Sequence, residues 1–474
     1  MEYLYDALLK YQASEAYPFH MPGHKRRKNF VNPFFIDITE IYGFDNLHHA
    51  EGILKEAQKR AAVLYGAEET HFLVNGSTCG ILSAISACTA KGGKILMARN
   101  CHKAVYHGAL LQELEVIYLY PEKENSFGIN GGIFPDQVKQ ALNENPDIQA
   151  VIVTSPTYDG VVSDIGKIAG IVHQREIPLI VDEAHGAHFG FHPYFPKSAV
   201  QMGADIVIHS LHKTLPSLTQ TALLHVNGKR VDREKLRMYL GIYQSSSPSY
   251  VFMAGMDECI RTMQENGKEM FEKLKEHLEK FYKGAEKFSQ VRLAGSGLIG
   301  KSGVFDFDRS KLVISVKGTG MDGNWLDDRL RNRYHLELEM AAGTYALALT
   351  SVSDTAEGFQ RLYEALMEID HSIGSFEKKD GKEYCEADNV VTKNEHVCRI
   401  SEALESPKES VLLEKSEGRI SREFLYLYPP GIPILVPGER ISRGVLDKVK
   451  QFQQRGYSIQ GLEEYSLRKI QVMK

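Results

Sequence analysis

The stretch SLHKTLPSLTQ, residues 210–220, places Lys213 between two apolar runs and beside Ser210 and His212. A lysine amine can form a Schiff base with an aldehyde, which makes such a residue a candidate for covalent chemistry. A lysine in a polar loop can equally be an ordinary solvated residue. The interpretation of Lys213 therefore depends on the residues at the ends of the other apolar runs of the chain.

Two of those runs also end in residues suited to chemistry. The run HFLV precedes NGSTCG, in which Gly76, Ser77 and Thr78 open a predicted helix. The free N–H groups of a helix N-terminus can bind phosphate, although Asn-Gly-Ser is also a common turn before a helix. The run PLIV precedes DEAHG, which contains Asp182 and His185. A carboxylate that ends a buried strand needs a cationic partner, and a nearby arginine could supply it.

Seven short apolar runs alternate with amphipathic stretches over residues 71–226: HFLV, KILMA, EVIYLY, AVIVTS, PLIVDE, DIVIHS and TALLHV. Buried strands separated by helices predict a mostly parallel α/β sheet. The last two runs are too close for a helical crossover, so we expect that pair to be antiparallel. Ligands of such sheets bind beyond the carboxyl ends of the strands, which is where the polar residues would meet.

Together these residues fit pyridoxal 5′-phosphate (PLP). Lys213 would form the Schiff base. Asp182, 31 positions earlier, would keep the pyridine nitrogen protonated so that the ring can accept electrons. An imidazole over one face would hold the ring flat, and the hydroxyls and the helix N-terminus would hold the phosphate. His102 comes soon after the run KILMA, a place where a lone histidine is more often structural.

The rest of the chain is predicted to form smaller units around a PLP-binding domain at 46–290. Residues 1–45 are rich in aromatic residues, proline and glycine, and we expect an irregular N-terminal arm that packs on another surface. A small α+β domain is expected at 291–372. The charged stretch SFEKKDGKEYCEADNVVTKNEH predicts a linker, within a C-terminal domain at 373–474.

The composition excludes several classes of protein. The 474 residues carry a net charge of −5 and are 43% hydrophobic, with no basic patch typical of nucleic-acid binding. No run approaches the ~18 apolar residues of a membrane span. The six cysteines form neither a CxxC pair nor a zinc-binding spacing. We expect a cytoplasmic protein with reduced thiols, no metal site, and no nucleic-acid or membrane partner.

Four segments, FHMPGHK, DEAHG, SLHKTLPSLTQ and YPPGIPILVPGE, together resemble the Orn/Lys/Arg decarboxylase family. The resemblance extends over nearly the whole chain and implies PLP fold type I, the aspartate aminotransferase fold. The resemblance is to the short biosynthetic branch, so we expect a protein without the extra N-terminal domain of the large inducible members. By position, the resemblance implies that Lys213 anchors the cofactor, Asp182 pairs with the ring nitrogen, His102 stacks on the ring and His185 lies near the ring hydroxyl. It assigns the phosphate to Ser77, Thr78, Ser210 and His212.

The resemblance further implies decarboxylation of a basic L-amino acid in polyamine biosynthesis. L-Arginine, which would yield agmatine and carbon dioxide, is favoured over L-lysine and L-ornithine. An aminotransferase, a β-eliminating lyase or a non-catalytic regulator are the alternatives. An aminotransferase usually holds the substrate carboxylate with an arginine late in its small domain, and the comparable stretch TYALALTSVSDT contains none.

Two further expectations concern the substrate side chain and the assembly. A cationic side chain in a desolvated pocket needs a carboxylate partner, and Glu439 is the candidate. A surface pair with Arg440 or Arg443 is the alternative for Glu439. The aromatic and proline-rich arm at 1–45 would be poorly accommodated in water, and we therefore expect a homodimer or a higher homo-oligomer.

Overall fold

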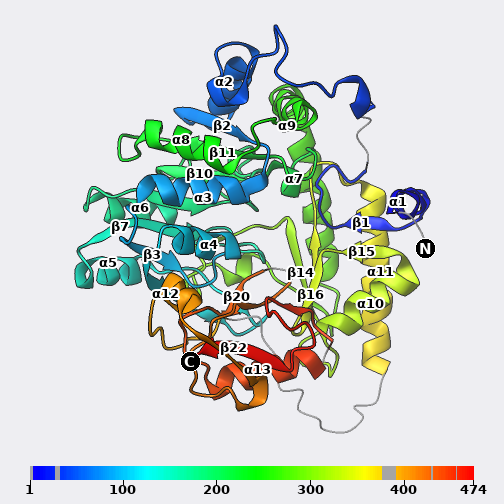
Figure 1. Cartoon of the computed structure of the whole chain (residues 1–474). Helices are drawn as coiled ribbons and strands as arrows, with labels where there is room; N and C mark the ends of the chain where they lie inside the picture. The colour runs from blue at the N-terminus through cyan, green and yellow to red at the C-terminus, as the bar shows by residue number, and fades with distance from the viewer. Residues whose placement is uncertain (1–3, 27–31, 376–390, 429–430, 455) are drawn as a thin grey trace.

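The computed structural model describes residues 4–26, 32–375, 391–428, 431–454 and 456–474. At its centre is a seven-stranded sheet with the order β2-β11-β10-β9-β7-β3-β4 (Figure 1). Each of the seven apolar runs forms one of these strands. The strands are β2 (Glu69–Leu73), β3 (Lys94–Ala98), β4 (Glu115–Leu119), β7 (Ile148–Thr154), β9 (Leu179–Asp182), β10 (Ile206–His209) and β11 (Ala222–Val226).

The sheet is mostly parallel, as predicted. Strands β4, β3, β7, β9 and β10 pair in parallel. Strand β11 is antiparallel to β10 and to β2, so the expectation for the last pair is confirmed. Because β7, β9 and β10 run in the same direction, the residues just after them emerge at the same edge. In the register of the sheet, Asp182 lies between Thr154 and Ile208.

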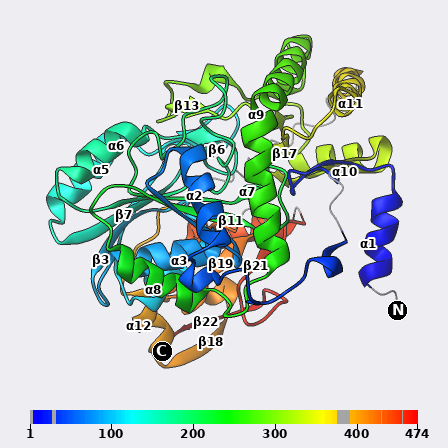
Figure 2. The ribbon, with the colours of Figure 1, turned by 90° about the horizontal axis from the view of Figure 1, so that it is seen from above.

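Helices cover both faces of the sheet (Figure 2). Side chains alternate between the two faces of a strand. In β11, Leu224 packs into the core formed with α3 (Gly76–Cys88) and α8 (Arg233–Tyr243), whereas Leu223 packs into the core formed with α2 (Ile53–Tyr65) and α9 (Tyr250–Ala285). Helix α2 ends at Gly66, which has φ 71° and adopts the left-handed conformation that favours glycine at a helix end.

A second, four-stranded sheet comes after α9. Its order is β12 (Arg292–Leu293), β14 (Lys311–Ser315), β17 (Tyr345–Leu349) and β16 (Met340–Ala342). Helices α10 (Gly323–Tyr334) and α11 (Ala356–Ser375) lie beside it. The N-terminal arm is more regular than predicted. It contains helix α1 (Leu4–Ala13), and β1 (Tyr17–Phe19) pairs in parallel with β15 (Leu336–Leu338), which fixes the arm to this unit.

The C-terminal residues build their own small core. Strand β18 (Lys408–Leu412) pairs with β22 (Lys469–Met473), and β19 (Leu425–Leu427) lies between β20 (Pro433–Leu435) and β21 (Ile459–Gln460). Helix α13 (Arg443–Gln454) contributes buried residues to that core, and α12 (Ile400–Glu405) contacts α4 (Lys103–Leu111) of the large unit. Most of the predicted charged linker, residues 376–390, lies outside the described residues. Within the described part, no helix is both long and apolar enough to span a membrane.

Candidate active site

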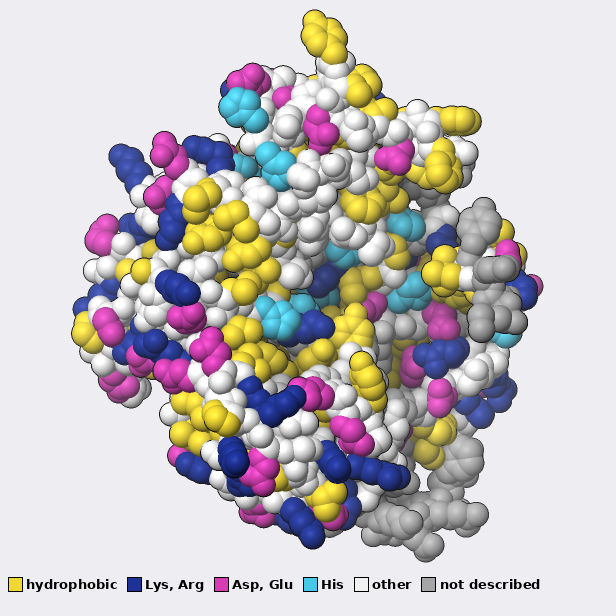
Figure 3. Space-filling model, viewed as in Figure 1, with side chains coloured by type: hydrophobic (Ala, Val, Ile, Leu, Met, Phe, Trp, Pro, Cys, Tyr) yellow, Lys and Arg dark blue, Asp and Glu magenta, His cyan; other side chains and the backbone are white. Residues whose placement is uncertain are grey.

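A cavity of about 560 Å³ opens where the three units meet. In Figure 3, histidine side chains and basic (Lys or Arg) side chains are visible in the hollow near the middle of the face. It lies beyond the carboxyl ends of β7, β9 and β10, as expected for an open parallel sheet. All of the predicted site residues except Glu439 line it: Gly76, Ser77, Thr78, His102, Asp182, His185, Ser210, His212 and Lys213.

Lys213 does not lie in a loop. It belongs to a single helical turn, α7 (Leu211–Thr214), that begins directly after β10. Its Nζ atom lies 3.0 Å from Nε2 of His185. Burial lowers the pKa of Lys213 below its usual range, while the charge of Asp182 raises it. A lysine in this environment can lose its proton more easily than a surface lysine, and only the neutral amine is nucleophilic.

The side chains of the two acids of DEAHG, Asp182 and Glu183, point in different directions. Asp182, 3% exposed, lines the cavity, and its Oδ1 accepts a hydrogen bond from the backbone N of Ala184 at 3.1 Å. Burial raises the pKa of Asp182, and the charge of Lys213 lowers it. Glu183 turns away from the cavity and accepts from Ser198 Oγ at 2.6 Å, with His209 Nε2 also 2.6 Å away. Asp182 therefore faces the cavity as a carboxylate with no directly paired cation in the described ranges, whereas Glu183 is enclosed in structural hydrogen bonds.

The predicted phosphate-binding residues converge on one part of the cavity. Helix α3 begins at Gly76, whose φ of 73° is in the left-handed region that favours glycine. Ser77 and Thr78 lie in its first turn. Ser210 approaches from the end of β10, and its buried Oγ has no hydrogen-bond partner among the described residues. A buried hydroxyl without a partner is costly, so a ligand oxygen at this position would satisfy it.

Two histidines of the cavity are oriented by the backbone. His102 is the N-cap of α4, and its Nδ1 accepts from the backbone N of Ala104 at 3.2 Å. Burial, followed by the charge of Lys213, lowers the pKa of His102 to about 3. His212 donates from Nδ1 to the carbonyl oxygen of Thr221 at 2.9 Å, and burial lowers its pKa to about 4. Both rings are therefore held neutral and in defined orientations.

The structure brings residues to the cavity that the sequence did not indicate. Glu339 lines it from the second sheet unit, and Tyr158 packs its ring on His185 with 4.4 Å between ring centroids. The Tyr158 hydroxyl donates to Glu339, and the backbone N of Met21 donates to the same carboxylate at 2.9 Å. Tyr158 lies in PTYDG, directly after the run AVIVTS. The position at a strand end was therefore the available signal for Tyr158, whereas no local pattern distinguishes Glu339.

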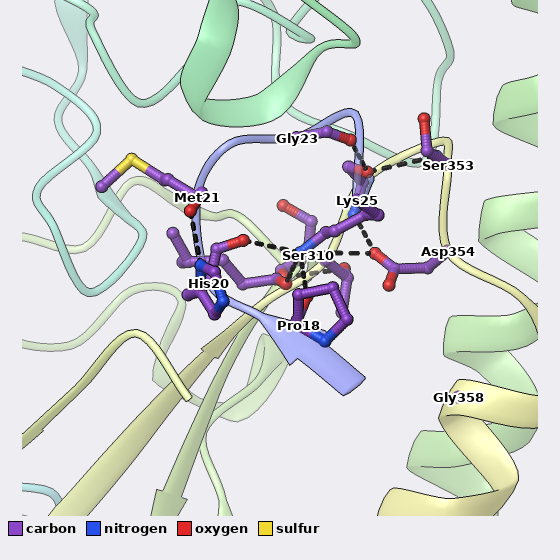
Figure 4. Close-up of polar contacts among 12 residues, drawn as sticks. Pro18, His20, Met21, Gly23, Lys25, Ser310, Ser353, Asp354 and Gly358 are labelled. Carbon is purple, nitrogen blue, oxygen red and sulfur yellow. Dashed lines mark hydrogen bonds and ion pairs between the residues drawn. The ribbon is translucent and has the colours of Figure 1, made fainter. Parts of the chain in front are cut away.

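The segment FHMPGHK folds over the cavity and is held by a buried lysine. Met21 and Pro22 line the cavity. Lys25, 3% exposed, donates from Nζ to the carbonyl oxygens of Leu349, Pro18 and His20 at 2.7, 3.0 and 3.1 Å. It also lies 3.7 Å from Oδ2 of Asp354 (Figure 4). The arm is thereby attached to the end of β17, which explains why this segment can form part of the site.

Glu439 does not line the cavity, and its predicted substrate-binding role is wrong. Its side chain is fully buried and forms an ion pair with Arg99, in which Arg99 Nη2 lies 3.1 Å from Oε2. Asn394 and the backbone N of Val436 also donate to Oε2, at 2.9 and 3.0 Å. The alternative surface pairing is wrong as well, because Arg440 pairs with Glu395. The Pro and Gly residues around Glu439 indicated a rigid segment that could hold a binding residue. Nothing in the sequence indicated that Arg99 lies opposite Glu439.

The motif that contains Glu439 reaches the cavity through other residues. Tyr428 and Ile432 of YPPGIPILVPGE line the cavity. A Cβ atom at Gly431, which has φ 81°, would lie 3.3 Å from Nε2 of His102. The C-terminal unit therefore closes over the imidazole predicted to stack on the ring. Pro429 and Pro430 lie outside the described residues.

Comparisons with known proteins agree with this architecture. The family model for the Orn/Lys/Arg decarboxylase major domain matches residues 3–327, and that for the C-terminal domain matches 383–465. Arginine decarboxylase from Bacillus subtilis (strain 168) is 31% identical over 482 residues, which cover 99% of this chain and 97% of that protein.

Solved structures extend the likeness at the level of the fold. Lysine decarboxylase A from Pseudomonas aeruginosa has a TM-score of 0.75 at 22% identity, covering 99% of this chain and 80% of that one. Ureidoglycine-glyoxylate aminotransferase from Bacillus subtilis has a TM-score of 0.55 at 15% identity, covering 69% of this chain and 87% of that one. The predicted fold type I is thus confirmed. With both family models and a full-length relative in agreement, the chain belongs to the Orn/Lys/Arg decarboxylase family.

Proposed function

We propose that this protein is a PLP-dependent decarboxylase of a basic L-amino acid, with L-arginine as the favoured substrate and agmatine and carbon dioxide as products. The observation that carries the proposal is the convergence of Lys213, His185 and Asp182 in one cavity at the strand ends. The full-length similarity to an arginine decarboxylase supports arginine over lysine and ornithine. A role in polyamine biosynthesis and a cytoplasmic location accord with this activity. Among the described residues the cysteines form no disulfide, as is typical of a reducing compartment.

The residues that line the cavity fit PLP. The partnerless Ser210 hydroxyl and the first turn of α3 would hold the phosphate. His212 Nδ1 is already committed to a carbonyl, so only Nε2 faces a ligand. A phosphate at Nε2 would favour the protonated ring, because a nearby negative charge raises the pKa of a histidine. The buried Asp182 would keep a proton on the pyridine nitrogen, and neutral His102 would lie against the ring.

When bound, PLP would supply an electron sink for the pair of electrons left at the substrate Cα as carbon dioxide departs. The other requirements fall on the residues of this chain. Lys213 would provide the amine that anchors the cofactor and later releases the product. Tyr158 and the C-terminal residues Tyr428 and Ile432 would exclude water from the reacting carbon.

The lining of the cavity favours decarboxylation over transamination. PLP activates the bond at Cα that stands perpendicular to the ring, and an aminotransferase keeps the substrate carboxylate out of that position. Among the described residues that line the cavity there is no arginine to hold the carboxylate in the ring plane. This agrees with the absence of arginine from TYALALTSVSDT. A carboxylate without such a clamp is free to occupy the perpendicular position.

Glu339 is the proposed partner of the substrate's cationic side chain. It lines the cavity, is half-buried, and is oriented by the Tyr158 hydroxyl and the backbone N of Met21. Each carboxylate oxygen can accept a further hydrogen bond, so a guanidinium or ammonium group can still bind. The other two acids of the cavity are less suited. Asp182 faces the predicted ring nitrogen, and Asp159 is already bonded to Tyr345 at 2.6 Å.

The test is to incubate PLP-loaded protein with L-arginine, L-lysine and L-ornithine and to identify the products. We expect agmatine and carbon dioxide from arginine at the highest kcat/KM. A keto acid in place of an amine would show an aminotransferase, and release of carbon dioxide from none of the three would overturn the proposal. The variant Glu339→Gln should raise KM by about tenfold or more, because the substrate's cationic group loses a charge-assisted hydrogen bond. Glu337→Gln, whose carboxylate pairs with Arg331 on the same chain segment, is the matched control.

We further propose that the active form is a homodimer in which the N-terminal arm is buried. Phe34 and Phe35 are 85% and 80% exposed, and Tyr42 is fully exposed. Such a group of exposed aromatic residues is typical of an interface. Sedimentation velocity should show a dimer, and the double change Phe34→Ser and Phe35→Ser should weaken it. Tyr465→Ser, which removes an equally exposed ring near the C-terminus, should not. A fully active monomer would contradict this proposal.

A further inference from the structure

A second buried lysine contacts the same imidazole as Lys213. Lys311 is the first residue of β14 in the second sheet unit, and its Nζ lies 3.0 Å from Nδ1 of His185. On the other side of the ring, Nε2 lies 3.0 Å from Nζ of Lys213. Lys311 is 1% exposed and His185 is 6% exposed. The roles proposed above make no use of Lys311.

The backbone is shaped to admit this side chain. Gly160 has φ 98°, and a Cβ atom there would lie 3.0 Å from Cγ of Lys311 and 3.1 Å from the carbonyl oxygen of Asp308. A larger residue at 160 would displace the lysine stem. Residue 160 belongs to the segment after β7, whereas Lys311 comes from the second sheet. The contact between Lys311 and His185 therefore forms only when the two units are docked.

The hydrogen bonds to His185 are best satisfied when only one of the two lysines is protonated to an ammonium. A lysine ammonium donates and cannot accept, and a neutral imidazole has one donor nitrogen and one acceptor nitrogen. Burial, together with the charges of both lysines, lowers the pKa of His185 well below its usual value, so the ring is neutral. Both contacts are satisfied when one lysine is an ammonium that donates to the ring and the other is an amine that accepts from it. Two ammonium groups would leave one of them without an acceptor on this ring.

We propose that Lys311 accepts, through His185, the proton that Lys213 must lose to become nucleophilic. The proton of Lys213 Nζ passes to Nε2 of His185 as the proton on Nδ1 passes to Nζ of Lys311. The imidazole changes tautomer and never becomes charged. The net charge of the cluster is unchanged, so the transfer needs no exchange with solvent.

The surroundings of Lys311 allow it to gain and lose a proton in the neutral to mildly alkaline range. Burial lowers the pKa of Lys311 to about 8, and the charge of Asp308 opposes that shift. The charged and titratable groups that influence Lys311 and His185 are Asp159, Asp308, Glu339, Lys25, Lys213, His102 and His212. In the described part of the chain, no carboxylate lies within ion-pair distance of either Lys213 or Lys311. Neither lysine is therefore held permanently in its charged form. Lys311 acts only through His185 and is a positioning residue.

The inference rests on Lys213 as the cofactor anchor, and the test uses the apoprotein. PLP is added over a range of pH, and the rate of formation of the borohydride-fixable adduct is measured. In that reaction the Lys213 amine adds to the aldehyde carbon, a C=N bond forms and water leaves. In Lys311→Met the rate near neutral pH should fall about 10²-fold, the low end of the contribution of a positioned acid or base. It should recover at alkaline pH, where hydroxide can take the proton.

Two further variants separate the relay from simpler roles. Arginine keeps the positive charge but cannot accept a proton, so Lys311→Arg should be as slow as Lys311→Met. If Lys311→Arg captures PLP at the wild-type rate, Lys311 acts only through its charge and the relay is excluded. Lys317→Met, two residues beyond the other end of β14, is the matched control and should capture PLP at the wild-type rate. Circular dichroism verifies that each variant is folded.

A direct readout does not depend on any substitution at Lys311. In apoprotein labelled with [¹⁵N]histidine, His185 is identified by the loss of its signals in His185→Gln. The relay predicts one protonated and one unprotonated ring nitrogen at neutral pH. A protonated imidazolium would overturn the proposal. If the wild type fails to capture PLP at all, the proposed function fails. If it captures PLP and the pH profile of Lys311→Met is unchanged, only the relay fails.

Discussion

Two of the buried charged clusters in the described part of the chain are built differently. In the first, Arg99 and Glu439 are both fully buried, and Arg99 also donates to the carbonyl oxygen of Pro433 at 2.7 Å and to the Tyr106 hydroxyl at 3.0 Å. In the second, Lys213 and Lys311 share one neutral imidazole, with no directly paired carboxylate in the described part of the chain. The first cluster is electrostatically satisfied and the second is not.

The difference separates a structural role from a chemical one. The Arg99–Glu439 pair joins the end of β3 to the C-terminal unit, and breaking a buried pair leaves an uncompensated charge. Lys213 and Lys311 destabilise the fold, because burial lowers the pKa values of both. Groups retained at a cost to stability are typical of functional sites. Substitutions in the Arg99–Glu439 cluster should therefore reduce stability and spare activity. Substitutions in the lysine cluster should reduce activity and spare stability.

The largest effect is expected for Lys213→Ala. It should abolish both the visible absorption of the PLP-loaded protein and turnover, with a loss of more than about 10³-fold in kcat. Its Tm should equal or exceed that of the wild type, because a buried cation is removed. Differential scanning calorimetry and product assays measure the two quantities. A marked loss of stability with activity retained would give Lys213 a structural role and contradict its assignment to the chemistry.

Asp182→Asn should reduce the rate by roughly 10³-fold, or about 4 kcal/mol in the activation barrier. A neutral amide stabilises a protonated pyridine nitrogen much less than a carboxylate does. PLP should still bind, because the phosphate contacts and Lys213 remain. Steady-state kinetics and the absorption spectrum distinguish these outcomes. Turnover close to that of the wild type would remove the ring-nitrogen role from Asp182.

Glu439→Gln should act on stability and leave the chemistry intact. Arg99 would remain buried without its counter-charge, at a cost of about 3–5 kcal/mol in the free energy of unfolding. The folded fraction should retain the wild-type KM for arginine. Arg440→Gln, which removes a solvent-exposed pair with Glu395, is the matched control and should leave the free energy of unfolding close to that of the wild type. A changed KM with unchanged stability would return Glu439 to the substrate site.

The smallest effect is expected for Lys25→Met. Lys25 contributes both to stability and to the shape of the cavity, so its substitution should change both quantities moderately. Three carbonyl oxygens lose their donor, at about 1–3 kcal/mol of stability. Because Met21 and Pro22 line the cavity, KM should also rise by a few-fold. Chemical denaturation and kinetics measure both. A change in stability alone would give Lys25 a purely structural role, and a change in KM alone would give it a role only at the active site.

The sequence predicted the parts of the site that local patterns encode. Apolar runs identified the strands, and the sheet rule then brought Asp182, His185 and Lys213 together at one edge. Lys311 lies in the second sheet and Glu339 directly before its strand β16. The docking of this unit onto the first sheet is a long-range event without a local signature. The same holds for Glu439, since nothing near residue 439 indicates that Arg99 faces it. The arm was expected to be irregular because propensity alone does not show that β1 pairs with β15.

The most direct test of the central claim is to locate the cofactor's covalent attachment in the protein. PLP-loaded protein is reduced with borohydride, digested and mapped by mass spectrometry. The structure predicts a single pyridoxyl group, on Lys213, with Lys311 and Lys25 unmodified. Attachment to Lys311, to another lysine, or to none would contradict the assignment of this cavity as the active site.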